Sequence, residues 1–348
     1  MSIITPNTKT AIILFNLGGP NSLDAVQPFL FNLFYDPAII RVPKPVRYFL
    51  AKLISKKRAP IAQEIYKELG NRSPILPNTQ AQADALKSAL SAHGQVECFI
   101  TMRYWHPMSD EVVKQVQSYA PDHIILLTLY PQFSTTTTDS SVKDWQRAAQ
   151  KTGMHIPTTT LCCYPTLDGF IEAQAALIKP YMQQSPNARL LFSAHGLPEK
   201  IIAAGDPYQW QVEQTTQSIL QKLGGSPDYV NCYQSRVGPL EWIKPSTEDE
   251  IKRAGADGKP IILIPLAFVS EHSETLVELD IEYKHLADEA GVPAYHRVPT
   301  VSVQPDFIQG LADLCLAQTP DKKLCSHKGG RICPSSFTGC PHQAKLAA

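Results

Sequence analysis

The chain has 348 residues, of which 43% are hydrophobic, and this is enough to bury a sizeable core. A chain of this length is expected to form two domains. Lys and Arg together number 32, and so do Asp and Glu, so the formal net charge is zero. This balance argues against a nucleic-acid partner, which selects a basic surface. No run of about 18 apolar residues occurs, so no membrane-spanning helix is predicted.

The N-terminus, MSIITPNTKTAIILF, passes directly into a strand-like run. It lacks the basic segment and cleavage site of a signal peptide, and the Arg and Ser enrichment of a transit peptide. We therefore expect a cytoplasmic protein that begins here. In that compartment the eight cysteines are expected to be reduced, metal-bound or structural rather than paired in disulfides.

Short apolar runs typical of buried strands alternate along the chain with longer helical patterns. The runs begin at Thr10, Val96, His123 and Thr158, and then at Ala188, Asp228, Pro260 and Ala294. The segments between them that favour helices include Ala81–His93, Asp110–Tyr119, Phe170–Gln184 and Trp210–Leu223. Such alternation predicts an α/β fold with parallel sheets covered on both faces by helices. Two sets of four runs predict two similar halves, each with a four-stranded parallel sheet.

These halves define three expected regions. The N-terminal half covers residues 1–165 and the C-terminal half covers residues 166–303. Residues 304–348 are expected to form a helix and a cysteine-rich tail that packs back on the N-terminal half.

Unusual polar motifs follow four of the predicted strands. Asn16–Pro20 follows the first strand, Arg103–Pro107 the second, Ser193–Pro198 the fifth and Ser270–His272 the seventh. Because ligands bind beyond the carboxyl ends of the strands in open α/β sheets, these motifs predict a cleft between the two halves. His195 can take up a proton near neutral pH, although a hydrogen-bonded structural histidine is the alternative.

A row of carboxylates follows the seventh strand, at Glu271, Glu274, Glu278 and Glu282. Spacings of three and four residues place them on one face of a helix, where like charges repel. Only Lys284 lies near enough in sequence to neutralise them. Such a row, beginning beside His272, favours attraction of a divalent cation or conduction of protons. A solvated polar face is the alternative.

The segment from Phe29 to Pro60 is rich in large apolar residues and in cations. The interleaved cations are Arg41, Lys44, Arg47, Lys52, Lys56, Lys57 and Arg58. Amphipathic helices with a basic edge bind membrane interfaces or hold apolar ligands with acidic tails. A pair of ordinary core-facing helices is the alternative.

Three cysteines, Cys325, Cys333 and Cys340, lie in the Gly-rich tail. Thiolates in such a segment suit zinc or an iron–sulfur cluster, both of which usually need four ligands. The candidates for the fourth ligand are Cys162 and Cys163, with His327 and His342 as weaker ones. Incidental thiols in a disordered tail are the alternative.

Seven motifs in order make the chain resemble the ferrochelatase family from Ala11 to about Leu316. They are NLGGP, SPI (Ser73–Ile75), MRYWHP, YPQFS (Tyr130–Ser134), FSAHGLP, YQSRVGPLEW (Tyr233–Trp242) and FVSEHSETLVELDIEY. The resemblance implies two Rossmann-like halves with a porphyrin between them. It also implies a lyase that inserts ferrous iron into protoporphyrin IX to give protohaem, the last step of haem synthesis.

The resemblance also implies roles for individual residues. His195 and Glu274 would handle the metal and the two pyrrole protons, His272 would support Glu274, and Glu278 and Glu282 would continue a path for protons or metal. The porphyrin pocket would be lined by Asn16, Leu17, Arg103, Tyr104, Trp242 and Phe268. The basic apolar segment from Phe29 resembles the active-site lip of the family, which sits at a membrane surface.

The cysteine tail resembles the [2Fe–2S] motif of some ferrochelatases, with Cys325, Cys333, Cys340 and either Cys163 or Cys162 as ligands. Directly after the YPQFS motif, where the animal enzymes place a cysteine, this chain has Thr135, so the cysteine pair resembles the arrangement of some bacterial members. Three alternatives remain: a chelatase for coproporphyrin, one for cobalt, and a non-catalytic porphyrin or haem carrier. We expect a cytoplasmic location with peripheral contact to the inner membrane, and the oligomeric state stays open, with a homodimer as one alternative.

Overall fold

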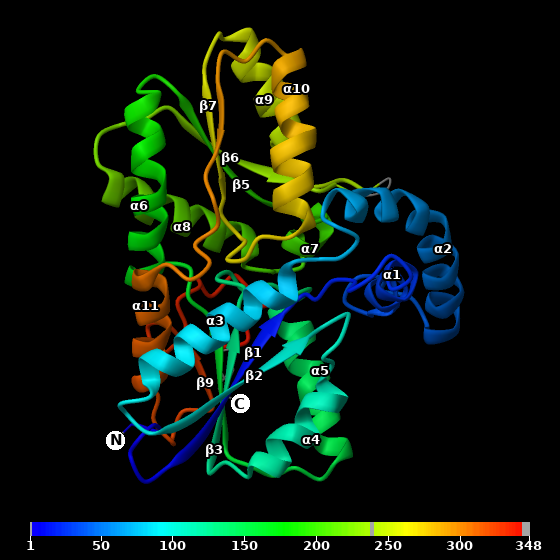
Figure 1. The fold of residues 1–348 in the computed structure, drawn as a ribbon, viewed down its shortest axis with the longest axis vertical. Coiled ribbons are helices and arrows are strands. Elements are labelled where there is room, and N and C mark those ends of the chain that lie inside the picture. Colours follow the sequence, from blue (N-terminus) through cyan, green and yellow to red (C-terminus); the bar gives the residue numbers. More distant parts are fainter. Residues whose placement is uncertain (1, 237–239, 343–348) are drawn as a thin grey trace. The chain divides into compact units, whose positions relative to one another are not determined.

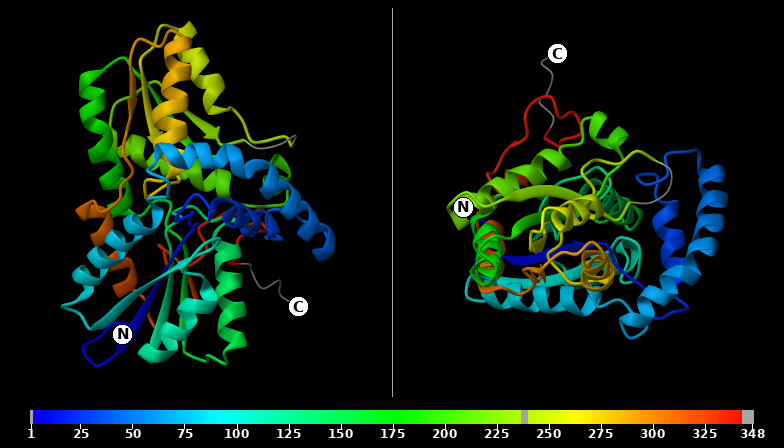
Figure 2. Two further views of the ribbon diagram at one scale, coloured as in Figure 1. Left: turned by 45° about the vertical axis from the view of Figure 1, so that its right-hand side comes forward. Right: turned by 90° about the horizontal axis from the view of Figure 1, so that it is seen from above.

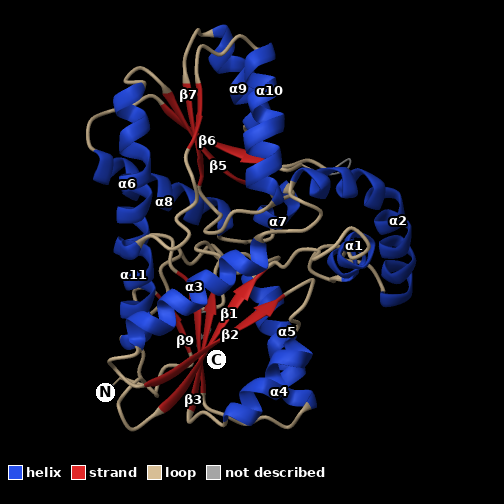
Figure 3. Ribbon diagram, viewed as in Figure 1, coloured by secondary structure: helices blue, strands red, loops and turns tan. Residues whose placement is uncertain are grey.

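A computed structural model describes residues 2–236 and 240–342. The chain divides into two compact units. The first unit contains Met1–Tyr130, Ser134–Cys163 and Ala312–Gly330. The second unit contains Pro131–Phe133, Tyr164–Leu311 and Arg331–Ala348. Each unit is an α/β layer structure built on one parallel sheet (Figures 1 and 3).

The sheet of the first unit has the strand order β2-β1-β3-β4-β9, and all its neighbours are parallel. Its strands are β1 (Lys9–Asn16), β2 (Gln95–Met102), β3 (His123–Thr128), β4 (Thr158–Cys163) and β9 (Leu324–Ser326). The strand order reverses at β1, because β2 pairs with one edge of β1 and β3 pairs with the other. The carboxyl end of β1, at Asn16, is therefore the position where this fold class binds ligands.

The helices of this unit are α1 (Val26–Tyr35), α2 (Lys44–Glu68), α3 (Ile75–Leu90), α4 (Ser109–Tyr119) and α5 (Thr138–Lys151). Helices α3, α4 and α5 cover the two faces of the sheet. Right-handed crossovers in this strand order place α3 on one face and α4 with α5 on the other. Val113 of α4 and Trp145 of α5 pack with Ile13 and Leu126 of the sheet. Helices α1 and α2 form a side-by-side pair that precedes α3 in the chain (Figure 2).

The second unit repeats the plan with the strand order β6-β5-β7-β8, again parallel throughout. Its strands are β5 (Arg189–His195), β6 (Tyr229–Gln234), β7 (Ile261–Pro265) and β8 (Tyr295–Arg297). Its helices are α6 (Asp168–Gln184), α7 (Glu199–Ala203), α8 (Tyr208–Leu223), α9 (Thr247–Ala256), η1 (Glu274–Glu282) and α10 (Tyr283–Glu289). Helices α9, η1 and α10 bury Ile251, Leu279 and Ala287 against Leu191 and Leu263.

The expected α/β fold with parallel sheets and flanking helices is confirmed, with two corrections. The first sheet has five strands rather than four, because residues Leu324–Ser326 of the tail pair with β4 as a parallel edge strand. The exposed edge of β4 offers unpaired backbone groups that a short segment can satisfy. Helix α11 (Pro305–Leu316) leads into this strand.

The second correction concerns the acidic row. Glu274–Glu282 form a π-helix rather than an α-helix, and Glu271 lies before it. Such π-helical turns are rare and are frequently found at functional sites.

Within the described part of the chain, no helix combines the length and the apolar character needed to cross a bilayer.

Candidate active site

His195 is the last residue of β5, a strand whose other residues are all buried. Its Nδ1 lies 2.6 Å from the carbonyl oxygen of Gly196, and the Tyr208 hydroxyl donates to the His195 carbonyl at 3.1 Å. A carbonyl can only accept, so Nδ1 carries the proton of this bond. Nε2 of the neutral ring is therefore an acceptor with an available lone pair, which is the form that a base or metal ligand needs.

Glu274, the first residue of η1, faces two imidazoles. Its Oε2 lies 3.8 Å from Nε2 of His195 and 3.9 Å from Nε2 of His272. Both distances exceed a hydrogen bond, so the three groups are close without being bonded to each other. His195 and Glu274 remain partly exposed, whereas the His272 side chain is only 7% exposed. Burial lowers the pKa of His272 and so favours its neutral form.

Glu278 lies four residues after Glu274 and is held by several donors. Ser235 donates through its backbone N–H at 2.9 Å and through its hydroxyl at 2.5 Å. Gln234 Nε2 donates at 3.2 Å and the Tyr283 hydroxyl at 3.0 Å. Burial, with the neighbouring charge of Glu274, nevertheless raises the pKa of Glu278 to about 7. This carboxyl can therefore gain or lose a proton at neutral pH.

The structure divides the four predicted acids into two groups. Glu274, Glu278 and Glu282 belong to η1, and Glu282 at its end is exposed. Glu271 instead accepts from Arg297 Nη1 at 2.6 Å, and although burial opposes it, the charge of Arg297 lowers the pKa of Glu271. The expectation that the whole row is uncompensated is wrong for Glu271. A cation 26 residues later in the chain supplies the charge.

Lys284, the nearest cation in sequence, does not neutralise the row. It pairs with Asp288 at 2.5 Å. Within the described residues, Glu274, Glu278 and Glu282 form no ion pair with a Lys or Arg, and only the two histidines lie beside Glu274.

Two predicted aromatic residues lie beside the histidines. The rings of Trp242 and His195 are 6.5 Å apart, and those of Phe268 and His272 are 4.6 Å apart. Of the motif that ends at Trp242, residues 237–239 lie outside the described residues. The second unit therefore brings His195, His272, Glu274 and Glu278 together with two aromatic rings.

The other predicted pocket residues belong to the first unit. Asn16 is buried and donates through Nδ2 to the Thr79 hydroxyl at 2.9 Å, while Leu17 follows it, half-buried, at the end of β1. Tyr104 is buried, and burial is the main reason that its pKa is raised. Its hydroxyl donates to Asp36 at 2.8 Å, and so does Arg103 Nη2 at 2.8 Å.

Sequence reasoning missed Asp36, Gln234 and Ser235. Asp36 is buried and accepts hydrogen bonds from both Arg103 and Tyr104. The only feature of the sequence that could have pointed to it is the position of an acid among apolar residues. Gln234 is the last residue of β6 and Ser235 follows it, inside the motif that begins at Tyr233, so their position at a strand end could have identified them.

The predicted cluster ligands are divided between the units. Cys162 and Cys163 have sulfurs 3.6 Å apart at the end of β4, and Cys325 lies in β9 of the same sheet. Cys333 and Cys340 lie in the second unit, and both are buried. No group of three or more His, Cys, Asp or Glu side chains is assembled for a metal among residues 2–236 and 240–342.

Of the two predicted cluster ligands in the second unit, Cys340 has a lowered pKa. A hydrogen bond from Cys333 lowers the pKa of Cys340 to about 6, and Gln211 Nε2 donates to the Cys333 sulfur at 3.2 Å. Of the weaker candidates, His342 has a pKa lowered by burial, and its carbonyl accepts from Arg331. His327 lies beside β9, where its backbone N–H donates to the Cys163 carbonyl at 3.1 Å.

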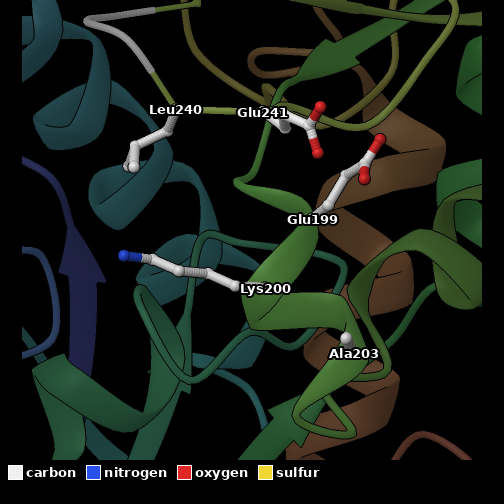
Figure 4. A pocket seen from close by; sticks show the side chains of 5 residues that line it. All are labelled: Glu199, Lys200, Ala203, Leu240 and Glu241. Atoms are coloured by element: carbon white, nitrogen blue, oxygen red, sulfur yellow. The ribbon is translucent and has the colours of Figure 1, made fainter.

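A shallow hollow lies beside α7, with a volume of about 360 Å³. Figure 4 shows the carboxylates of Glu199 and Glu241 on one side of it and Lys200 on the other. Ala203 and Leu240 complete its lining. Its position just after the His195 loop makes it a neighbour of the site in sequence, but the histidines and η1 carboxylates do not line it.

Comparison with known proteins identifies the family. The family model described as Ferrochelatase matches residues 9–319. The chain belongs to the ferrochelatase family. The ferrochelatase of Pelagibacter ubique is 51% identical over 338 residues, which cover 96% of this chain and 98% of that one. The ferrochelatase of Caulobacter vibrioides is 54% identical over 342 residues, covering 96% of this chain and 97% of that one.

Among solved structures, SirB from Bacillus subtilis with Fe³⁺ is similar with a TM-score of 0.52. It is 15% identical and covers 89% of this chain and 96% of that one, so it supports the fold alone. The predicted ferrochelatase family and the predicted reaction, insertion of iron into a porphyrin for haem synthesis, are confirmed by the family match and by relatives that span nearly the whole chain.

Proposed function

We propose that this ferrochelatase acts as a lyase on protoporphyrin IX and ferrous iron, with His195 and Glu274 at the reacting centre. The observation that carries this assignment is the pair of facing groups, His195 Nε2 and Glu274 Oε2, 3.8 Å apart. One is an imidazole lone pair and the other a carboxylate, and both are partly exposed. These groups can bind a ferrous ion or accept a proton from a pyrrole nitrogen.

The reaction exchanges one ferrous ion for two protons, so the site must remove protons as iron enters the ring. His195 Nε2 can accept a proton because Nδ1 is occupied by the Gly196 carbonyl. Glu278, with its pKa raised to about 7 by burial, can accept and release a proton under the same conditions. Glu282, exposed at the end of η1, would pass the proton to water. His272, buried beside Glu274, would act as a positioning residue.

The substrate porphyrin would contact Asn16, Leu17, Arg103, Tyr104, Trp242 and Phe268. The α1–α2 pair supports an apolar porphyrin rather than a polar one. Helix α2 exposes large apolar side chains at Val46, Tyr48, Phe49, Leu53 and Ile61, and the connection from α1 to α2 exposes Ile39. Interleaved with the cations of α2, these side chains also suit peripheral contact with the cytoplasmic face of an anionic membrane.

The test is anaerobic haem formation from ferrous iron and protoporphyrin IX by wild type, His195→Gln, Glu274→Gln and Glu289→Gln. Loss of a positioned proton acceptor should lower kcat by about 100-fold or more. Glu289→Gln is the matched control, because it makes the same chemical change at an exposed position of α10. Near-normal turnover by His195→Gln or Glu274→Gln would overturn the assignment.

Two further arms separate the competing functions. A carrier would bind porphyrin, measured by fluorescence quenching, without metallation by the wild type. Coproporphyrin or cobalt turned over with a higher kcat/KM than protoporphyrin IX and ferrous iron would replace the proposed substrate or metal.

For the cysteines we propose a [2Fe–2S] cluster held by Cys163, Cys325, Cys333 and Cys340. The lowered pKa of Cys340 supports thiolate ligation, although the described residues assemble no complete ligand set within one unit. When bound, the cluster would serve a structural or sensing role, because metal insertion transfers no net electron. The visible spectrum and sulfide content of anaerobically purified protein should show it, Cys333→Ser should lose it and Cys98→Ser should keep it. A colourless wild type without sulfide would contradict the cluster.

A further inference from the structure

A large cavity in the first unit shares Arg103 with the proposed porphyrin pocket and contains none of the other residues assigned to that pocket. It has a volume of about 700 Å³ and lies among the end of α1, the start of α2 and α5. Its lining is rich in charge. The cations that line it are Arg41, Lys44, Arg47, Arg103, Lys143 and Arg147, and the acids are Asp36, Asp139 and Asp144. The lining therefore contains twice as many cations as acids.

Each of the three acids already pairs with a cation of the same lining. Arg103 bonds Asp36 at 2.8 Å, and Lys143 bonds Asp139 at 2.6 Å. Arg147 bonds Asp144 at 2.9 Å, and it also pairs with Asp110 outside the cavity.

The other three cations, Arg41, Lys44 and Arg47, form no ion pair with any residue that the structure describes. Their charges are the excess positive charge of the cavity.

Arg47 is held in place but has a donor without an acceptor. Its Nη1 donates to the Val42 carbonyl at 3.0 Å, and its guanidinium lies 5.5 Å from the centre of the Tyr35 ring. Its Nε is buried and has no hydrogen-bond partner among the described residues. A buried donor without a partner costs free energy.

The start of α2 adds to the positive potential. The helix has 25 residues and begins at Lys44, its first turn contains no acid, and Pro43 before it provides no side-chain cap. The N-terminal end of a long helix carries partial positive charge and attracts anions. The helix end and the three unpaired cations of the lining all favour an anionic ligand.

We propose that this cavity binds a phosphate group. A phosphate presents several acceptor oxygens and matches the forked donors of two arginines and the charge of a lysine. The group can belong to free phosphate or to the headgroup of a phospholipid. The headgroup fits the exposed Val46, Phe49 and Leu53 of the same helix, because these side chains can enter the adjoining acyl layer. The proposal requires neither porphyrin nor turnover, so it stands apart from the proposed function.

The first test is calorimetric titration of the full chain with inorganic phosphate at low ionic strength. Arg41→Gln and Arg47→Gln should each weaken binding about ten-fold, the usual effect of losing one charge-assisted hydrogen bond. Lys52→Gln is the matched control, because it removes one cation from α2 without touching the cavity lining, and it should leave the Kd unchanged. Arg47→Lys keeps the charge and should retain intermediate affinity, which separates binding from a folding defect.

A vesicle arm identifies the source of the phosphate. If the headgroup binds, vesicles of phosphatidylglycerol should displace inorganic phosphate, and Arg47→Gln should weaken sedimentation with them more than Lys52→Gln does. Phosphate binding that such vesicles leave unchanged would support the soluble source. The proposal would be overturned if the wild type bound no phosphate, or if Lys52→Gln lost as much phosphate affinity as the cavity variants. It would also be overturned if protoporphyrin displaced phosphate, because the cavity would then belong to the porphyrin site.

Discussion

The hydrogen bond from Tyr283 to Glu278 sets how readily the buried carboxyl gives up its proton. The Tyr283 hydroxyl donates to Oε1 of Glu278 at 3.0 Å, and this bond stabilises the charged form of Glu278. Replacing Tyr283 by Phe removes the donor and keeps the ring. The pKa of Glu278, already raised to about 7 by burial, should therefore rise further.

The size of the shift follows from the remaining donors. A hydrogen bond to a charged group contributes about 1.5–3 kcal/mol, which corresponds to about one to two pKa units. Glu278 keeps the two donors of Ser235 and the amide of Gln234, so the lower value, about one unit, is expected. If Glu278 accepts a proton during metal insertion, kcat/KM should rise with pH through this pKa.

The assay is the pH profile of the initial rate of haem formation, measured anaerobically for wild type, Tyr283→Phe and Tyr295→Phe. The Tyr283 variant should have its rising limb displaced by about one unit to higher pH. Tyr295→Phe is the matched control, because the Tyr295 hydroxyl bonds the Leu279 carbonyl at 2.6 Å and not Glu278. An unmoved limb in Tyr283→Phe, or an equal displacement in Tyr295→Phe, would refute the role of Glu278.

Three stability predictions follow from other contacts. The pKa of Glu278 is higher in the folded protein than its ordinary value of 4.5, so protonation of this carboxyl stabilises the fold. This stabilisation is fully present below pH 4.5 and is lost as the pH rises through about 7. The free energy of unfolding of Glu278→Gln should therefore increase relative to that of the wild type by up to about 3 kcal/mol between about pH 5 and pH 8. A difference in denaturant unfolding that does not change with pH would contradict this. Asp36→Asn should cost about 3–5 kcal/mol, because it leaves the charge of Arg103 buried without its partner, and a loss below about 1 kcal/mol would refute that reading. Gly169→Ala should cost about 1–3 kcal/mol in the same assay, since a Cβ there would overlap the carbonyl oxygen of Asp306; an unchanged midpoint would show that the backbone yields freely.

Local patterns were sufficient to predict every described strand of the two sheets except β9. Runs such as Ile12–Leu14 and Ile261–Ile264 are continuously apolar because a parallel sheet buries both faces of a strand. A strand of three residues, Leu324–Ser326, carries no such pattern, and only its pairing with β4 creates it. Strand β9 could therefore not be predicted, whereas the other strands could.

For the candidate site, the sequence by itself determined which residues stand at strand ends, because a strand's carboxyl end is a position in the chain. His195 was predicted in this way. The acids of η1 were predicted from their spacing of three or four residues, and the family was predicted from seven motifs in their order along the chain. Only the tertiary structure decided the charge state and the partners of these groups. Arg297 neutralises Glu271 from 26 residues away, and burial with Glu274 beside it raises the pKa of Glu278. Charge pairing depends on the distance between groups in space, and desolvation depends on their burial. Neither quantity can be calculated from the spacing of residues along the chain.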